Sequence, residues 1–280
     1  MSVYDILING CSDIANTIRE LTGKTEAISP LNFDEEIRKI VTARDLLDKT
    51  ITEYDFQDKI SIPEYAFYKC ANLSKVNCSN ITNIGAHAFY DCTSLSSIEL
   101  PDTVETIGTN AFQQSGLTEI VLPPNLTKLN GNVFIYCKKL ESITFNDKIQ
   151  SIGHMTFRGC HVLEQDIILP ESCKTIGQEA FRASPIKSLS GYLTTISNGA
   201  FRECSELKTL TLKGDTVCTL SATSAFTDTP IALGEGYIVI DTGNKDKDAE
   251  LLSEYVNATN WSAYASQIRT KNGSAPDIWE

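Results

Sequence analysis

The strongest constraint on this chain is a phrase that returns every 20 to 25 residues along most of its length. Its fixed point is a phenylalanine, which alanine precedes in six of eight copies. A period of this length is typical of a solenoid, in which each repeat forms one coil and buries its apolar edge only by stacking on its neighbours. The repeat therefore predicts about eight stacked coils with one inner column of rings: Phe67, Phe89, Phe112, Phe134, Phe157, Phe181, Phe201 and Phe226.

A small side chain follows each phenylalanine by three residues, and an apolar anchor such as Leu95 comes soon after it. The small residue is cysteine in five copies, and Ser115, Ser184 or Thr229 in the other three. In those three copies the anchor arrives one residue earlier. Because spacing and residue type change together, the sequence predicts one shared tight corner. We expect the cysteines to be mostly free, buried thiols.

Short alternating apolar stretches follow the anchors, as in SSIELP, TEIVLP, ESITFN and KTLTLK. Alternation with a period of two predicts a strand with one buried face. We expect inward pairs such as Ile98 and Leu100, and Pro101 ends that strand because proline cannot donate to the ladder. Four glycines that stand four residues before a phenylalanine predict close backbone approach or unusual backbone angles: Gly85, Gly108, Gly153 and Gly177.

The outward residues of these strands form the candidate binding face. Val121, Thr144 and Ile168 would form a small β-branched patch on an exposed sheet, flanked by Glu119 and Asp166. Exposed apolar residues ringed by polar ones can mark an interface. The alternative is that these residues stand here only because β-branched side chains favour strands. The candidate binding residues are Glu99, Glu119, Val121, Thr144, Asp166 and Ile168.

The repeated phrase, an apolar-x-apolar-Pro strand and then I-G-x-x-A-F-x-x-C, resembles the BspA-like leucine-rich repeat family over about residues 60–233. The resemblance implies a right-handed, β-rich leucine-rich repeat solenoid. It also implies binding of protein or carbohydrate surfaces, often in adhesion, without enzymatic activity. The copies at 130–134 and 196–201 depart from the phrase, so we expect a local irregularity or bend there.

Both ends of a solenoid must be covered, and the flanking segments suit this purpose. We expect a helical N-terminal segment over residues 1–50, the solenoid over 51–233, a small capping segment over 234–268 and a mobile tail over 269–280. Trp261 and Tyr264 have the bulk to close the last coil. The stretch DIANTIRELTGKTEAISPLNFDEEIRKI resembles a helical segment of tail and other structural proteins of phages from gut-type bacteria.

Charge and hydropathy exclude several partner classes. The net charge of −12 argues against nucleic acid, because phosphate binding needs clustered Lys and Arg. No apolar run approaches the roughly 18 residues of a membrane span, and no secretory signal peptide is visible. We therefore expect no membrane insertion and a cytoplasmic or virion-associated protein, with a surface or extracellular location as the alternative. The oligomeric state has no signature in the sequence.

Catalytic and metal-binding interpretations have little support. Cys160 and His161 are adjacent, but neighbouring residues of an extended chain point apart, and Cys160 already has a place in the repeat. The three histidines stand at variable positions, whereas zinc needs three or four convergent donors. We expect no enzymatic activity, no cofactor and no metal. Two alternatives stay open: a carbohydrate-active hydrolase that uses the repeats as a scaffold, and a passive structural spacer.

Overall fold

The computed structural model describes residues 49–56, 59–273 and 275 of the 280-residue chain. Contacts divide the chain between Ile51 and Thr52, and the second unit is described here by itself. The helical segment expected over residues 1–50, with its phage-like stretch, lies outside the described residues except for its last two positions.

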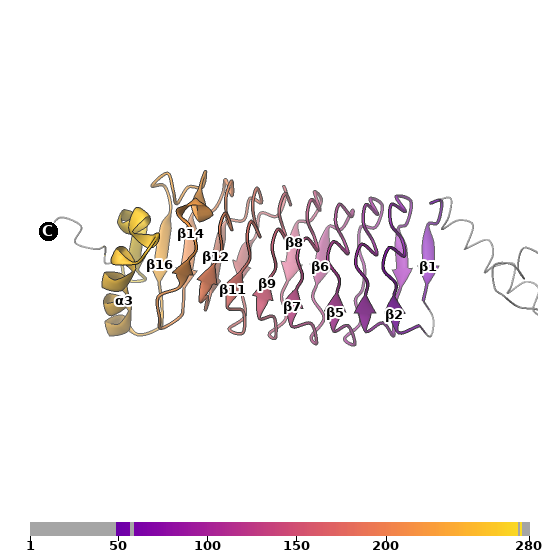
Figure 1. Cartoon of the computed structure of the whole chain (residues 1–280), viewed down its shortest axis with the longest axis horizontal. Coiled ribbons are helices and arrows are strands. Elements are labelled where there is room, and N and C mark those ends of the chain that lie inside the picture. The colour runs from indigo at the N-terminus through magenta and orange to yellow at the C-terminus, as the bar shows by residue number, and fades with distance from the viewer. Residues whose placement is uncertain (1–48, 57–58, 274, 276–280) are drawn as a thin grey trace, which may run out of the picture. The chain divides into compact units, whose positions relative to one another are not determined.

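The second unit is a stack of coils in which two rows of short parallel strands run along the axis (Figure 1). The first row follows the apolar anchors and contains β1 (Glu53–Asp55), β3 (Lys75–Asn77), β6 (Glu119–Val121), β8 (Ser142–Thr144), β10 (Asp166–Ile168), β12 (Ser188–Gly191), β14 (Thr209–Leu212), β16 (Tyr237–Ile240) and β17 (Ile268–Thr270). The second row contains two-residue strands: β2 (Ser61–Ile62), β4 (Asn83–Ile84), β5 (Thr106–Ile107), β7 (Lys128–Leu129), β9 (Ser151–Ile152), β11 (Thr175–Ile176), β13 (Thr195–Ile196) and β15 (Thr219–Leu220). The predicted solenoid is confirmed.

The eight phenylalanines form the centre of the core. Each has at most 1% of its surface exposed. Consecutive rings are stacked with centroids 5.1–5.8 Å apart and planes within 18° of parallel. This repeat is slightly longer than the spacing of about 4.8 Å between strands, so the rings stack at ordinary aromatic distance while the backbones remain hydrogen-bonded.

The turn around each phenylalanine depends on left-handed backbone, which the sequence does not reveal. The residue two before the ring and the residue two after it have positive φ in nearly every coil, for example His87 at 55° and Asp91 at 57°. Most of these positions are not glycine, so each conformation costs about 1–2 kcal/mol. Hydrogen bonds between coils offset this cost, as where the Phe67 N–H donates to the Ala88 carbonyl at 2.8 Å.

The glycine column is explained by close approach between coils. A Cβ on Gly153 would lie 2.7 Å from the carbonyl carbon of Asn130, and one on Gly177 would lie 2.6 Å from that of Gly153. Neither glycine has a positive φ, so the requirement is for space. Asn130 stands where the motif has glycine, and its Nδ2 donates to the Ile107 carbonyl at 2.6 Å. At this point the ladder of the second row is interrupted, because the described strands β5 and β7 do not pair with each other.

The irregularity expected at residues 130–134 is therefore present in the second row. The one expected at 196–201 is absent, because β13 pairs with both β11 and β15. In the first row, β12 likewise pairs with β10 and β14 across the shortest coil.

The C-terminal segment closes the last coil, which includes the short helix η2 (Thr223–Phe226). Helix α3 (Lys245–Asn257) and the 3-10 helix η3 (Trp261–Gln267) cover the end of the stack (Figure 1). The Trp261 ring lies 6.1 Å from that of Phe226, and its Nε1 donates to the Cys218 carbonyl at 2.6 Å. Tyr264 packs edge-on against Phe226 at 5.2 Å, so both expected capping residues occupy this end. Strand β17 includes the first two residues of the stretch expected to be a mobile tail.

Candidate binding face

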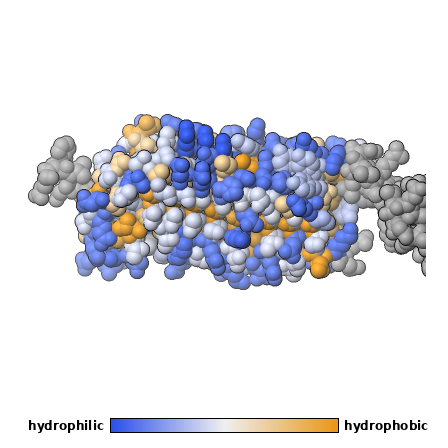
Figure 2. All heavy atoms as spheres, viewed as in Figure 1, coloured by the Kyte–Doolittle hydropathy of each residue, from blue (hydrophilic) through white to orange (hydrophobic). Residues whose placement is uncertain are grey.

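The outward residues of the first row are exposed on β3, β6, β8 and β10 and half-buried on β12 and β14. Val121 and Ile168 have 64% and 70% of their surfaces exposed, which is high for large apolar residues. Glu119, Thr144 and Asp166 are also exposed on the same strands, and Glu99 lies exposed on the coil before β6. On the side seen in Figure 2, hydrophilic residues cover most of the rod and hydrophobic residues show along its middle.

The structure does not bring all of these residues onto one continuous sheet. Val121 is paired with Thr144 across β6 and β8, whereas Ile168 on β10 is paired with Ser190. Within the described sheets, β8 and β10 do not pair with each other. The expected patch is thus divided by a gap between Thr144 and Ile168, and the binding role of its residues stays a prediction.

One inserted residue causes this gap, and its side chain fills it. Three residues lie between the anchor Leu163 and the inward Ile167, whereas two lie between Leu140 and Ile143 in the previous coil. The Gln165 carboxamide takes the place of a peptide group in the ladder. Its Oε1 accepts from the Ile143 N–H at 2.7 Å, and its Nε2 donates to the Ile143 carbonyl at 3.0 Å.

A second gap in the first row is open. Residues 97–100 have the alternation of a strand, but the structure pairs them with neither β3 nor β6. Hollows of about 770 and 400 Å³ flank this segment, one toward β3 and one toward β6. Ile98 and Leu100 line both hollows and are half-buried between the exposed Ser97 and Glu99, so the pair alternates as expected but is less buried than the inward residues of β6 and β8. We call these two hollows and the segment between them the β3–β6 groove.

A cysteine contributes to the opening of the groove. Cys78 stands at the inward position after β3 that Leu122 occupies after β6. Its thiol lies 3.3 Å from the Glu99 carbonyl oxygen and donates to it. Within the described chain, this is the one hydrogen bond to residues 97–100. The side chain of Cys78 is smaller than leucine and leaves space at this inward position. Its thiol also bonds to the Glu99 carbonyl, an acceptor that a neighbouring strand would otherwise use.

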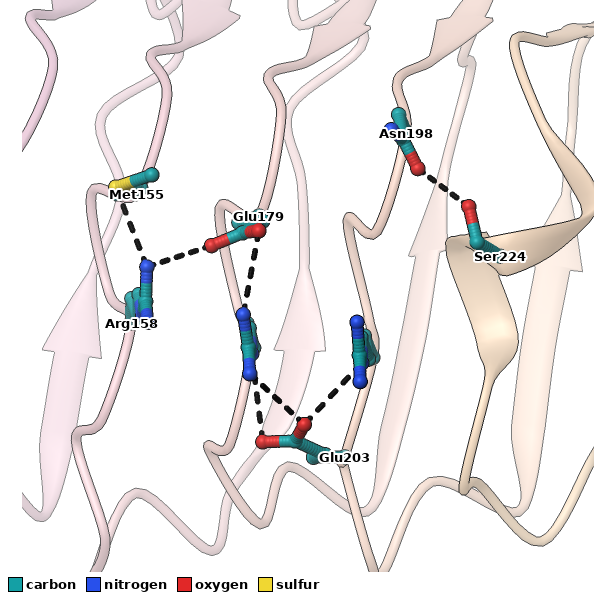
Figure 3. A network of polar contacts seen from close by, with 8 residues as sticks. Met155, Arg158, Glu179, Asn198, Glu203 and Ser224 are labelled. Atoms are coloured by element: carbon teal, nitrogen blue, oxygen red, sulfur yellow. Dashed lines mark hydrogen bonds and ion pairs between the residues drawn. The ribbon is translucent and has the colours of Figure 1, made fainter.

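A ladder of charged side chains on the phenylalanine turns was missed by the sequence reasoning (Figure 3). Arg158 contacts Glu179 at 2.7 Å, and Arg182 contacts both Glu179 at 3.3 Å and Glu203 at 3.0 Å. Arg202 lies 3.2 Å from Glu203. The hydrogen bond from Arg182 lowers the pKa of Glu203. Arginine directly after phenylalanine in three consecutive coils was the available signal. Such surface pairs contribute below about 1 kcal/mol each.

Aromatic residues occupy the same turns in the first coils. The Tyr65 and His87 rings stack at 4.6 Å, and those of Tyr68 and Tyr90 stack at 4.8 Å. His87, which was expected at a variable position of its turn, thus stacks on a tyrosine of the preceding coil. Among the described residues, no three His, Cys, Asp or Glu side chains come together as a possible metal site.

The cysteine column is explained by hydrogen bonds between coils. Four thiols of the column donate to the carbonyl of the phenylalanine one coil earlier, for example at 2.9 Å from Cys137 to Phe112 and at 3.0 Å from Cys204 to Phe181. The Ser184 hydroxyl donates in the same way to Phe157, which explains why serine can replace cysteine. All eight described cysteines are buried, as expected.

Burial also makes these thiols poor nucleophiles. It raises the pKa of Cys137 to about 12 and the pKa of Cys160 well above its ordinary value. The thiolate is the reactive form of cysteine. The adjacent Cys160 and His161 therefore give no activated nucleophile.

Parallel coils, a stacked ring column and an exposed strand row together define a leucine-rich repeat array. The BspA type leucine rich repeat region matches the sequence in six copies, over residues 60–187 and 132–233. The chain belongs to this BspA-type leucine-rich repeat family. No helix in the described part of the chain has the length and apolar character needed to span a membrane.

A solved structure shows the same fold. A leucine-rich repeat protein from Bacteroides ovatus is similar with a TM-score of 0.54 and 20% identity, over 69% of this chain and 56% of that one. The chain therefore spans little more than half the length of that protein. A leucine rich repeat protein from T. pallidum is 27% identical, with a TM-score of 0.42, over 60% of this chain and 69% of that one. A search of curated proteins finds no match.

Proposed function

We propose that this protein is a non-enzymatic recognition protein that binds a protein or glycan surface through the outward residues of the first row. Proteins of this family are typically surface, adhesion or protein-binding proteins. The observation that carries the proposal is the exposure of Val121 and Ile168, 64% and 70%, on the strand row of the stacked coils. Charged Glu119 and Asp166 stand on the same strands, in the arrangement of an apolar centre with a polar rim.

The proposal predicts that the variant carrying Val121→Asp and Ile168→Asp loses its partner without a lower melting temperature. Aspartate removes the apolar contact, and both sites are solvated, so stability should change by less than about 0.5 kcal/mol per site. Capture is measured on glycan and protein arrays with the full chain. The matched control carries Ile60→Asp and Leu233→Asp, since these residues are 66% and 70% exposed and belong to no strand of the first row.

Equal capture by the patch variant and the wild-type protein would contradict the proposal. A glycosidase panel run on the captured glycans separates recognition from hydrolysis, because turnover supports the alternative of a carbohydrate-active hydrolase. Absence of capture by the wild-type protein supports a passive spacer.

The setting in which the face acts is a further part of the proposal. The resemblance of residues 13–40 to phage structural proteins favours a component of a phage or prophage particle over a host surface adhesin. Mass spectrometry of particles purified after prophage induction tests this assignment. Detection of the protein on protease-shaved host cells, with none in the particles, would overturn it.

A further inference from the structure

We propose that the open face of the Tyr65 ring receives an arginine side chain of a partner protein. This ring lies on the turn around Phe67, outside the first strand row, so the inference does not depend on the proposed function. Three observations support it: the exposure of a ring that its surroundings hold in place, the cost of a tyrosine at this backbone position, and the cations that cover the other surface tyrosines.

The Tyr65 ring is exposed although its surroundings fix its position. Half of its surface, 50%, is exposed. One face stacks on His87, with centroids 4.6 Å apart and planes 9° from parallel, and Tyr68 packs edge-on at 5.5 Å. The Tyr65 N–H donates to the Ala86 carbonyl at 2.9 Å. A ring held on one face and one edge loses little conformational freedom when a ligand covers its other face.

Backbone preference does not explain a tyrosine at this position. Tyr65 has a φ of 58°, and the residue two before the phenylalanine also has positive φ in each of the next six coils. Three of those six residues are Asn110, Asn132 and Gly199, of the types that adopt left-handed backbone most readily. A bulky side chain is an outlier there, and such an outlier is a reason to look for a function. The ring itself is therefore the feature that needs an explanation.

The other tyrosines show which kind of group occupies a ring face on this surface. Tyr255 and Tyr264 are buried in the C-terminal cap, and Tyr90 is half-buried against Tyr68. Tyr65 is thus the one exposed tyrosine of the described chain that has no cation over its ring. Five other tyrosines each have a Lys or Arg 3.2–6.0 Å from the ring centroid: Tyr54, Tyr68, Tyr136, Tyr192 and Tyr237.

The chemistry of the open face favours arginine. The face of an aromatic ring is negative and attracts cations. A planar guanidinium stacks on a ring better than an ammonium does, and Arg269 lies 3.2 Å from the centroid of Tyr237 in this way. The exposed Glu64 precedes Tyr65 in the chain and offers a carboxylate for the same guanidinium. The net charge of −12 favours a basic partner, and tyrosine and arginine are both enriched where proteins meet.

The test uses the full chain and the capped tripeptide Gly-Arg-Gly as the probe. We expect saturable, millimolar binding by NMR, with saturation transfer from the protein to the arginine side chain and a shift of the Tyr65 ring signals. The same tripeptide with citrulline keeps the planar shape without the charge, and it should give neither signal. The tripeptide with lysine should bind about twofold to fivefold more weakly than the one with arginine.

Two variants of the protein locate the site. Tyr65→Asn introduces a residue that the repeat has at this position in two other coils, so the turn should still fold, and its transfer to the arginine peptide should fall to the citrulline level. The matched control is Tyr136→Gln, on another phenylalanine turn, where the ring already has a cation over it. Its precedent is Gln114, which has the same φ of 57° one coil earlier. The control should bind as the wild-type protein does, and melting temperatures report the folding of both variants.

Any of four results would overturn the inference. These are no saturation transfer at tens of millimolar arginine peptide, equal transfer to the citrulline peptide, undiminished transfer by folded Tyr65→Asn protein, or a Tyr65 ring shift with methyl glucoside and none with the arginine peptide. The last result would make the ring a sugar platform instead. The ring shift is measured on the wild-type protein, so it decides the question even if the asparagine variant does not fold.

Discussion

The ring column and the first strand row are built by the same coils, but only the column is continuous. All eight rings stack at 5.1–5.8 Å, whereas the row is interrupted at residues 97–100 and again between β8 and β10. A missing ring leaves a cavity between two neighbours, but an outward position can change without loss of packing. The comparison indicates that the core maintains the stack while the outer face is free to specialise.

The two gaps in the outer face also differ from each other. The gap at β8 and β10 is filled by Gln165, and the Asn130 side chain makes a similar replacement in the second row. At residues 97–100 the neighbouring side chain is a cysteine, which supplies one donor to one carbonyl. A carboxamide carries both a donor and an acceptor, as a peptide group does, whereas a thiol is a weak donor. This difference explains why one gap is closed and the other is a groove.

The largest effect that would test this comparison is expected from Phe134→Ala. Phe134 is fully buried between the rings of Phe112 and Phe157, so truncation should lower the free energy of unfolding by about 3–5 kcal/mol. Thr144→Ala, on the exposed face, should change it by less than about 0.5 kcal/mol. Urea denaturation monitored by circular dichroism measures both values. Similar losses from the two variants would show that the column is not the part that maintains the stack.

An intermediate effect is expected from the cysteine column at high pH. Burial raises the pKa of Cys137 to about 12, against about 8.5 for an unfolded thiol. The folded state therefore holds this proton where the unfolded chain releases it. The contribution is fully present below about pH 8.5 and is lost by about 1.4 kcal/mol per pH unit as the pH rises toward the folded value.

Cys137→Ser isolates this contribution, since serine retains a donor for the Phe112 carbonyl and occurs naturally at Ser115 and Ser184. Between about pH 8.5 and pH 10 the variant should lose about 2 kcal/mol less stability than the wild-type protein. Parallel stability curves for the two proteins, from urea denaturation at each pH, would mean that this thiol is not buried as described.

The smallest effect is expected from Gln165→Ala. The variant loses two hydrogen bonds to Ile143 at a half-buried site, which should cost about 1–2 kcal/mol. It should also speed hydrogen exchange at the Ile143 amide, because the gap would then be open to water. Gln165→Glu retains the acceptor for this amide and is the matched control. Unchanged exchange in the alanine variant would remove the distinction between the filled gap and the open groove.

Much of the architecture was predictable from the repeat. The spacing of phenylalanines predicted the stacked coils, the bulk of Trp261 and Tyr264 predicted the cap, and the departure at Asn130 predicted an irregularity. The single inserted residue before Ile167 was visible in the alignment of the coils, but its consequence was not. A spacing shows that an extra residue is present and does not show which neighbouring backbone group its side chain will reach.

The sequence by itself determined which residues are inside, because burial of rings and aliphatic side chains favours one phase of the repeat over every other. The tertiary structure decided where the strand row opens, since Ser97–Leu100 alternates as regularly as the paired strands do. Pairing depends on the neighbour as well as on the segment, and here the neighbour ends in Cys78 instead of a larger apolar residue. The left-handed turns were decided in the same way, because hydrogen bonds from adjacent coils stabilise backbone conformations that those residues disfavour alone.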